Sequence, residues 1–148
     1  MKKLWIAACG YATLGLFFGL LYRTLTHDGF DGRTQLSTTH THFLALGFIV
    51  MLVCVALEAA LKFSGSRSFT IFFTTYNAGL LITGGVMVWH GLLQLDGQQG
   101  GGMIAGIAGL GHILLTVGIA ALLVSLSKPI KNHLAARDAD RSDVVEVA

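Results

Sequence analysis

Four long apolar segments make up most of this chain, and they restrict its fold more than any other feature. They are Leu4–Tyr22, His42–Leu61, Phe69–Leu95 and Met103–Leu126. Each is close to the roughly 20 residues that an α-helix needs to cross about 30 Å of hydrocarbon. Charged residues make up 12% of the chain, about half of the roughly 25% usual in soluble domains. The sequence therefore predicts an all-α integral membrane four-helix bundle, with the lipid bilayer as its surroundings.

Basic residues indicate how the segments are oriented. They lie before the first segment, between the second and third, and after the fourth: Lys2, Lys3, Lys62, Arg67, Lys128, Lys131, Arg137 and Arg141. In the connection between the first two segments, Arg23 and Arg33 are balanced by two aspartates, at positions 28 and 31. Since cytoplasmic loops carry an excess of Lys and Arg, we expect both termini in the cytoplasm. The formal net charge of +2 forms no basic patch, so no nucleic-acid partner is expected.

The connections between the segments predict a compact arrangement. The turn Gly97–Gly102 is short and flexible, so consecutive helices should be antiparallel neighbours. Pro129 predicts the end of the fourth helix, because proline cannot donate a backbone hydrogen bond. We therefore divide the chain into a four-helix transmembrane domain, residues 1–127, and a cytoplasmic C-terminal tail, residues 128–148.

The longest connection, Arg23–Thr39, precedes the second helix. Gly29 and Gly32 are its expected turn residues. Hydroxyl side chains are favoured as N-caps, where they accept a hydrogen bond from a free backbone N–H. The candidate N-caps of the second helix are Ser37, Thr38 and Thr39.

Four histidines gather in the outer half of the predicted bundle. His40 and His42 lie at the outer end of the second helix, His90 about 7 Å deep in the third, and His112 about 15 Å deep in the fourth. Ionisable residues inside a membrane are rare and commonly mark a functional site. These four are the predicted cofactor-binding residues, and an interhelical hydrogen bond is the alternative interpretation of His112.

His40 and His42 are the strongest candidates for metal ligands, and they cannot easily bind the same ion. Successive residues of an α-helix are rotated by about 100°, so residues two apart face nearly opposite ways. If both are ligands, they serve two different sites on opposite flanks of the helix. Such an arrangement favours cofactor sites between neighbouring subunits or bundles.

The residues around the histidines favour haem or copper. Neutral imidazole is the commonest metal ligand, and its second nitrogen is usually held by a carbonyl, hydroxyl or carboxylate. Asp96 is the one acidic residue near the cluster, which argues against hard cations and a carboxylate-bridged di-iron site. Candidate partners for the second nitrogen are Thr38, Thr39, Thr41 and Gln94.

Glycines of the third and fourth helices could leave flat room for a porphyrin between backbones. These glycines are Gly84, Gly85, Gly91, Gly106, Gly109 and Gly111. Close helix packing is the alternative interpretation. The pairs Gly15 with Gly19 and Gly102 with Gly106 have the small-xxx-small spacing suited to helix contact. That spacing favours oligomerisation and internal packing equally.

The remaining polar residues of the segments have structural explanations. Glu58 lies four residues before Lys62 and is expected to form a surface ion pair with it. Tyr76 and Asn77, in the inner half of the third helix, are expected to form interhelical hydrogen bonds.

The stretch His40–Gly47, with the sequence HTHFLALG, resembles the haem-ligating helix of the haem-copper oxidase catalytic subunit. In that subunit a His-x-His at the outer end of one helix serves two haems on opposite sides. Its twelve helices form three pseudo-symmetric groups of four, and copper-ligating histidines lie on the third helix of another group, where this chain has His90. The whole chain also resembles a small bacterial family of four-helix membrane proteins of unknown function.

The resemblance implies a homotrimer of twelve helices in a bacterial inner membrane. Haem b would lie between second helices of adjacent subunits, with His42 of one and His40 of the next as axial ligands. The chain lacks the His-Pro-Glu-x-Tyr motif of the oxidases, and His90 is a single histidine instead of an adjacent pair. An oxygen-reducing haem-copper centre is therefore not expected.

The sequence thus predicts a cytochrome-like haem b protein that transfers electrons or binds a diatomic gas. Such a protein would have a redox partner and would act as a component of an oxidoreductase. Bis-histidine ligation favours electron transfer, because both axial positions are occupied. One alternative is a copper- or proton-handling transporter or assembly factor. Met51, Met87 and Met103 lie at different depths, so core filling explains them better than copper binding. The other alternative is a purely structural partner of a membrane complex.

Overall fold

The computed structural model describes residues 1–27, 30 and 32–146 of the chain, and in this part every regular element is a helix. The first span is α1 (Lys2–Thr26). The second span runs from Leu36 to Leu61 as three consecutive helical stretches: α2 (Leu36–His42), η1 (Phe43–Ile49) and α3 (Val50–Leu61). The third and fourth spans lie in α4 (Arg67–Leu95) and α5 (Gly102–Glu146). The predicted turn residue Gly29, and the charges of Asp28 and Asp31, lie outside the described residues.

The prediction of four membrane-spanning helices is confirmed at the level of length and composition. The helices that are long and apolar enough are Lys2–Thr26, Leu36–Leu61, Arg67–Leu95 and Gly102–Asp140. Each span begins or ends within a few residues of its predicted boundary, except where the second begins earlier and α5 continues past its predicted end. The chain is therefore an all-α, multi-pass membrane protein by its architecture.

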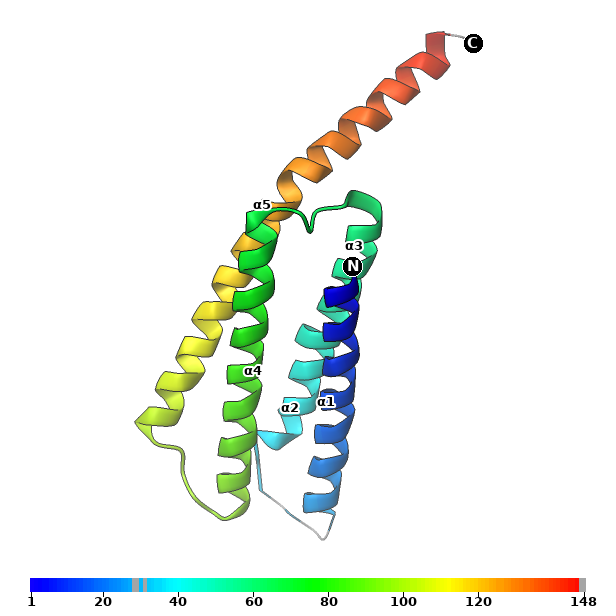
Figure 1. The fold of residues 1–148 in the computed structure, drawn as a ribbon. Coiled ribbons are helices and arrows are strands. Elements are labelled where there is room, and N and C mark those ends of the chain that lie inside the picture. Colours follow the sequence, from blue (N-terminus) through cyan, green and yellow to red (C-terminus); the bar gives the residue numbers. More distant parts are fainter. Residues whose placement is uncertain (28–29, 31, 147–148) are drawn as a thin grey trace.

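The helices form two antiparallel pairs (Figure 1). One pair is α1 with the second span, and the other is α4 with α5. The pairs meet mainly where α2 and η1 contact α4. The N-terminus, the connection from α3 to α4 and the C-terminal part of α5 all lie at the same end of the molecule (Figure 1). The histidines of α2 lie toward the opposite end.

The middle of the second span is a π-helix, η1, which the sequence did not predict. Such short π segments are rare and are frequent at functional sites. Two contacts hold this one. The Tyr76 hydroxyl of α4 donates a hydrogen bond to the Leu46 carbonyl, at 2.9 Å. Gly47 lies directly against the Tyr11 ring of α1, where a side chain would collide with it.

Phe43, the first residue of η1, lies at the centre of the packing between the two pairs. Its side chain is buried, and its ring stacks on Tyr11 and Phe18 of α1 with centroids 6.1 and 5.6 Å apart. On the other side it fills the space above Gly84 of α4. Leucines and aromatic residues of α1, α4, α5 and the connection after α3 complete the core: Leu4, Phe63, Phe69, Phe72, Tyr76, Leu80, Leu115 and Leu126.

The predicted N-caps of the second helix are wrong, because the helix begins earlier. Its first residue is Leu36, and Gln35 occupies the N-cap position without a side-chain hydrogen bond. The hydroxyls of Ser37, Thr38 and Thr39 all donate to carbonyls at the start of the helix instead. The early start follows from contacts with the end of α4: the Thr34 hydroxyl donates to the Gly91 carbonyl at 2.7 Å.

The predicted end of the fourth helix at Pro129 is also wrong, because α5 passes through this proline and continues to Glu146. A proline inside a helix costs about 3 kcal/mol, chiefly through one lost hydrogen bond and a steric clash, but it does not forbid the helix. The residues that follow include strong helix formers, Leu134, Ala135, Ala136 and Arg137. The predicted tail is therefore a helical extension of the last span (Figure 1).

Of the two structural predictions for polar residues, one is confirmed and one is wrong. Tyr76 and Asn77 form interhelical hydrogen bonds, Tyr76 to Leu46 and Asn77 as acceptor from the Tyr11 hydroxyl at 2.7 Å. Glu58 does not use Lys62. Its carboxylate accepts hydrogen bonds from the backbone N–H and hydroxyl of Ser64 and lies 3.9 Å from the N-terminal ammonium. The reason is that Lys62 is the left-handed residue at which α3 ends, so the chain turns away there.

Candidate functional site: the histidines of the second span

His40 lies on the flank of α2 that faces α1. A Cβ built on Gly19 of α1 would lie 3.6 Å from the Cβ of His40, so the absence of a side chain at Gly19 makes room for the imidazole. The Nδ1 atom of His40 is buried and has no hydrogen-bond partner. Its Nε2 atom lies 3.4 Å from the Thr41 hydroxyl, on the more exposed side of the ring.

His42 is held differently. Its side chain is half-buried, and its Nδ1 atom lies 3.1 Å from the backbone carbonyl oxygen of Thr38. A neutral imidazole whose Nδ1–H donates to a carbonyl carries its lone pair on Nε2. The hydrogen bond therefore fixes the tautomer and the ring orientation that a metal ligand needs.

The two rings lie on different flanks of the helix, as the spacing predicts. His40 is turned toward Gly19 of α1, whereas Leu36 and Phe43 mark the face toward α4, where they contact Gly91 and Gly84. At 100° per residue, His42 lies on the other side of this α4-facing stripe from His40.

His90 lies near the C-terminal end of α4, under the connection to α5. Its ring would collide with any side chain at Gly100, so the loop backbone covers it closely. His90 also lines a cavity of about 190 Å³ together with Gln35 and Ile104. Ligand pockets usually measure about 300–1,000 Å³, so this space is too small for a porphyrin within one chain.

His112 is exposed on α5. Its Nδ1 atom lies 2.8 Å from the carbonyl oxygen of Ala108, so it has the same fixed tautomer as His42. Across the part of the chain that the structure describes, no three His, Cys, Asp or Glu side chains come together as a metal site. The four predicted histidines are thus distributed over three helices and do not converge within a single chain.

The prediction that the glycines of α4 and α5 leave space for a porphyrin is wrong at three positions. Side chains or backbone fill the space at each: Phe43 at Gly84, Leu36 at Gly91 and Thr83 at Gly111. The close approach of helices within the chain explains these glycines. By contrast, a Cβ built at Gly85, Gly106 or Gly109 would have no described atom of another part of the chain within 4 Å.

The two small-xxx-small pairs also divide. Gly15 and Gly19 are used inside the chain, where a Cβ at Gly15 would lie 2.6 Å from the Leu44 side chain. A Cβ built at Gly102 or Gly106 would meet no described residue within 4 Å, so this pair of glycines is open to contact with lipid or another molecule.

The predicted partners of the second imidazole nitrogen contribute in part. Thr38 serves His42 through its carbonyl, and Thr41 lies near His40 through its hydroxyl. The Gln94 side chain instead accepts a hydrogen bond from the Gln35 backbone, and the Thr39 hydroxyl donates to the Gln35 carbonyl. The hydrogen bonds of these two residues position the start of α2 and do not involve the imidazole rings.

The methionines do not form a group. Met51 and Met87 are buried, which confirms core filling for both. Met103 is 65% exposed, so core filling is wrong there.

Gly19 and Tyr76 were expected to make helix contacts, but the sequence did not show that they support the span that carries His40 and His42. Gly19 makes room for His40, and the bond from Tyr76 to Leu46 holds the π-helix that follows His42. The spacing of Gly15 and Gly19 signalled a close helix contact, but it did not reveal which helix makes it. The residues of this segment show no pattern from which a π-helix could be predicted.

Four apolar spans in two antiparallel pairs define a polytopic helical membrane protein. The chain belongs to the family described as protein of unknown function (DUF2871), whose model matches residues 1–129. The match covers the first three spans and the fourth as far as Pro129. No curated protein and no solved structure matches the chain.

Proposed function

We propose that this protein binds haem b in the membrane with two axial histidines and acts as a cytochrome-like electron carrier. The observation that carries the proposal is the state of His42. Its Nδ1 atom is engaged with the Thr38 carbonyl, and its Nε2 atom is left as the coordinating nitrogen at the surface of the second span. This is the arrangement that haem-ligating imidazoles need.

The residues present fit a haem group held by imidazoles. His42 has the tautomer and ring orientation of a ligand. His40 lies two residues away on the opposite flank of the helix, and its Nε2 atom lies on the more exposed side of the ring. The Nδ1 atom of His40 is buried and lacks a hydrogen-bond partner, which is true of few buried polar atoms in native structures. Haem supplies one-electron redox chemistry when bound.

We propose further that the haem lies between copies of the chain. Two facts support this: the cavity that His90 lines is about 190 Å³, and the rings of His40 and His42 lie on different flanks of α2. A ligand pair made of His42 from one copy and His40 from the next closes a ring. Three copies give the twelve helices of the haem-copper oxidase subunit that the HTHFLALG stretch resembles.

The orientation completes the proposal. Eight of the ten Lys and Arg residues lie toward the end of the molecule that holds the N-terminus and the connection from α3 to α4, which supports a cytoplasmic position for this end in a bacterial inner membrane. The histidines then lie near the outer surface, where a periplasmic redox partner could exchange electrons with the haem. Bis-histidine ligation favours this role over binding of a diatomic gas, because no axial position is open.

The visible absorption spectrum of the protein purified in detergent, combined with metal analysis, tests the proposal. We expect a Soret band, sharp α and β bands on reduction, and iron in proportion to haem. Copper without haem would support a copper-handling transporter or assembly factor instead. Protein expressed with added haem precursor that carries neither metal would support a purely structural role.

A further inference from the structure

A cavity lies at the opposite end from the four predicted histidines, where most of the basic residues gather. It has a volume of about 590 Å³, within the usual range for ligand pockets. Its walls come from the end of α3, the connection to α4, the first turn of α4, and α5 around Pro129. The contact between α3 and α5 is slight, so the cavity opens between the two helix pairs.

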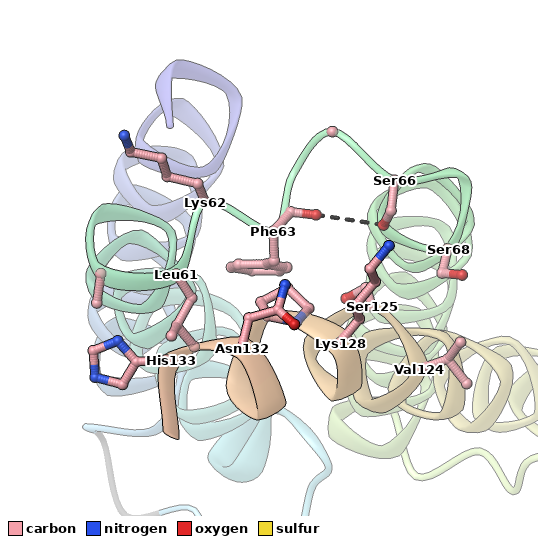
Figure 2. Close-up of a pocket in the computed structure, with 13 residues that line it drawn as sticks. Leu61, Lys62, Phe63, Ser66, Ser68, Val124, Ser125, Lys128, Asn132 and His133 are labelled. Atoms are coloured by element: carbon pink, nitrogen blue, oxygen red, sulfur yellow. Dashed lines mark hydrogen bonds between the residues drawn. The ribbon is translucent and has the colours of Figure 1, made fainter. Parts of the chain in front are cut away.

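The polar lining of this cavity suits an anion. Lys128, Asn132 and Ser68 supply an ammonium, an amide and a hydroxyl, and none of the described residues that line the cavity is acidic. Figure 2 shows the Lys128 amine beside Ser66 and Ser68, at the N-terminus of α4, and Lys62 on the opposite rim. These are donors of the kind that bind phosphate oxygens.

The first turn of α4 adds to the positive potential. Ser66 caps this 29-residue helix by accepting a hydrogen bond from the Phe69 N–H at 3.1 Å. Its hydroxyl also lies within hydrogen-bond distance of the Phe63 carbonyl. The helix N-terminus, with its partial positive charge, is therefore fixed at the wall of the cavity beside Lys128.

The remaining walls are apolar and continue into the membrane-spanning region. Phe63 is buried at the back of the cavity, while Val124 of α5 is 62% exposed and lies in the last apolar turns of the fourth span. A free anion would use only the polar half of such a site. A lipid would use both halves, with its phosphate at Lys128 and an acyl chain along Val124.

We propose that this cavity is a binding site for a phosphate group, supplied by an anionic phospholipid of the leaflet at the basic end of the molecule. The site is independent of the proposed haem, which lies at the other end. An occupant there would connect the two helix pairs, because α3, α4 and α5 all contribute to the walls.

Native mass spectrometry of the full chain tests the site with defined lipids. The protein is stripped of lipid in detergent and mixed with phosphatidylglycerol or phosphatidylcholine of the same chain length. We expect phosphatidylglycerol to be retained preferentially, and Lys128→Gln to weaken its retention about fivefold, the factor expected for one basic residue near an anionic surface. Lys128→Arg keeps the charge and should retain the lipid, which separates charge loss from misfolding.

Lys131→Gln is the matched control, because Lys131 is on the same helix, exposed, and not part of the lining. It should leave retention unchanged. Equal losses for the two glutamine variants, or equal retention of both lipids, would overturn the proposal. A third arm adds inorganic phosphate. Displacement of phosphatidylglycerol by millimolar phosphate would overturn the lipid as occupant and identify free phosphate, whereas unchanged lipid binding would support it.

Discussion

His42 and His112 have the same local arrangement, yet they differ in their surroundings. Each ring has its Nδ1 atom near the carbonyl four residues earlier, at 3.1 Å for His42 and 2.8 Å for His112. His42 is half-buried at the start of the π-helix, whereas His112 is exposed on α5. The two rings therefore share a tautomer and differ in burial.

His42→Ala should remove the low-spin haem spectrum. Loss of a residue that merely orients a ligand typically costs 10–100-fold in metal affinity, so loss of the ligand should lower haem content at least about tenfold. His40→Ala should have the same effect if His40 supplies the second axial bond. The haem-to-protein ratio from the reduced spectrum measures both.

His133→Ala is the control, since His133 lines the cavity at the other end of the molecule. It should leave the haem spectrum unchanged. An unchanged low-spin spectrum in both the His40 and His42 variants would refute the proposed ligation. If only His90→Ala or His112→Ala had an effect, the haem would be held by α4 and α5.

Among the helices, the contact between η1 and α4 has little freedom to adjust. Phe43 is 3% exposed, stacks on Tyr11 and Phe18, and fills the space above Gly84. Because the ring is held on both sides, it cannot move away from a methyl group added at Gly84.

Gly84→Ala should therefore destabilise the protein by about 1–3 kcal/mol, the usual cost of overpacking a core. Gly85→Ala is the matched control, because no described atom lies within 4 Å of a Cβ there. Both substitutions gain the same helix propensity, about 1 kcal/mol, so their difference reports the contact with Phe43. Thermal unfolding in detergent, followed by circular dichroism, should give a lower Tm for Gly84→Ala. Equal Tm values would show that Phe43 does not restrict this position.

The spans could be predicted from sequence because hydropathy depends on composition over a long window. Leu36–Leu61 and the other three spans follow from this signal alone. The π-helix at Phe43–Ile49 could not be predicted, since the hydrogen bond from Tyr76 to Leu46 and the fit of Gly47 against Tyr11 are tertiary contacts. The passage of α5 through Pro129 likewise depends on the whole helix and not on the proline alone.

Considered as a whole, the molecule has a proposed site at each end. The basic cavity lies beside the connection from α3 to α4, and two of the predicted histidines lie on α2, toward the opposite end of the bundle in Figure 1. From sequence, the opposed facing of His40 and His42 could be predicted because it depends only on helix geometry. The contacts of the glycines could not be predicted, because they depend on packing inside the chain. Phe43 fills the space at Gly84, whereas the space at Gly106 is open.

Assembly and haem binding should be coupled at the scale of the whole complex. If each haem is bound by two copies, the free energy of haem binding also stabilises the oligomer by mass action. Glycines that face outward, Gly102 and Gly106, could hold some oligomer together without haem. Loss of haem should therefore shift the complex toward monomers without dissociating it fully.

Native mass spectrometry of the complex in detergent measures the number of subunits and of haem groups in one experiment. The account predicts a haem-bearing homotrimer as the main species, and a shift toward haem-free monomer for His42→Ala. A haem-loaded monomer as the main species would contradict ligation between copies.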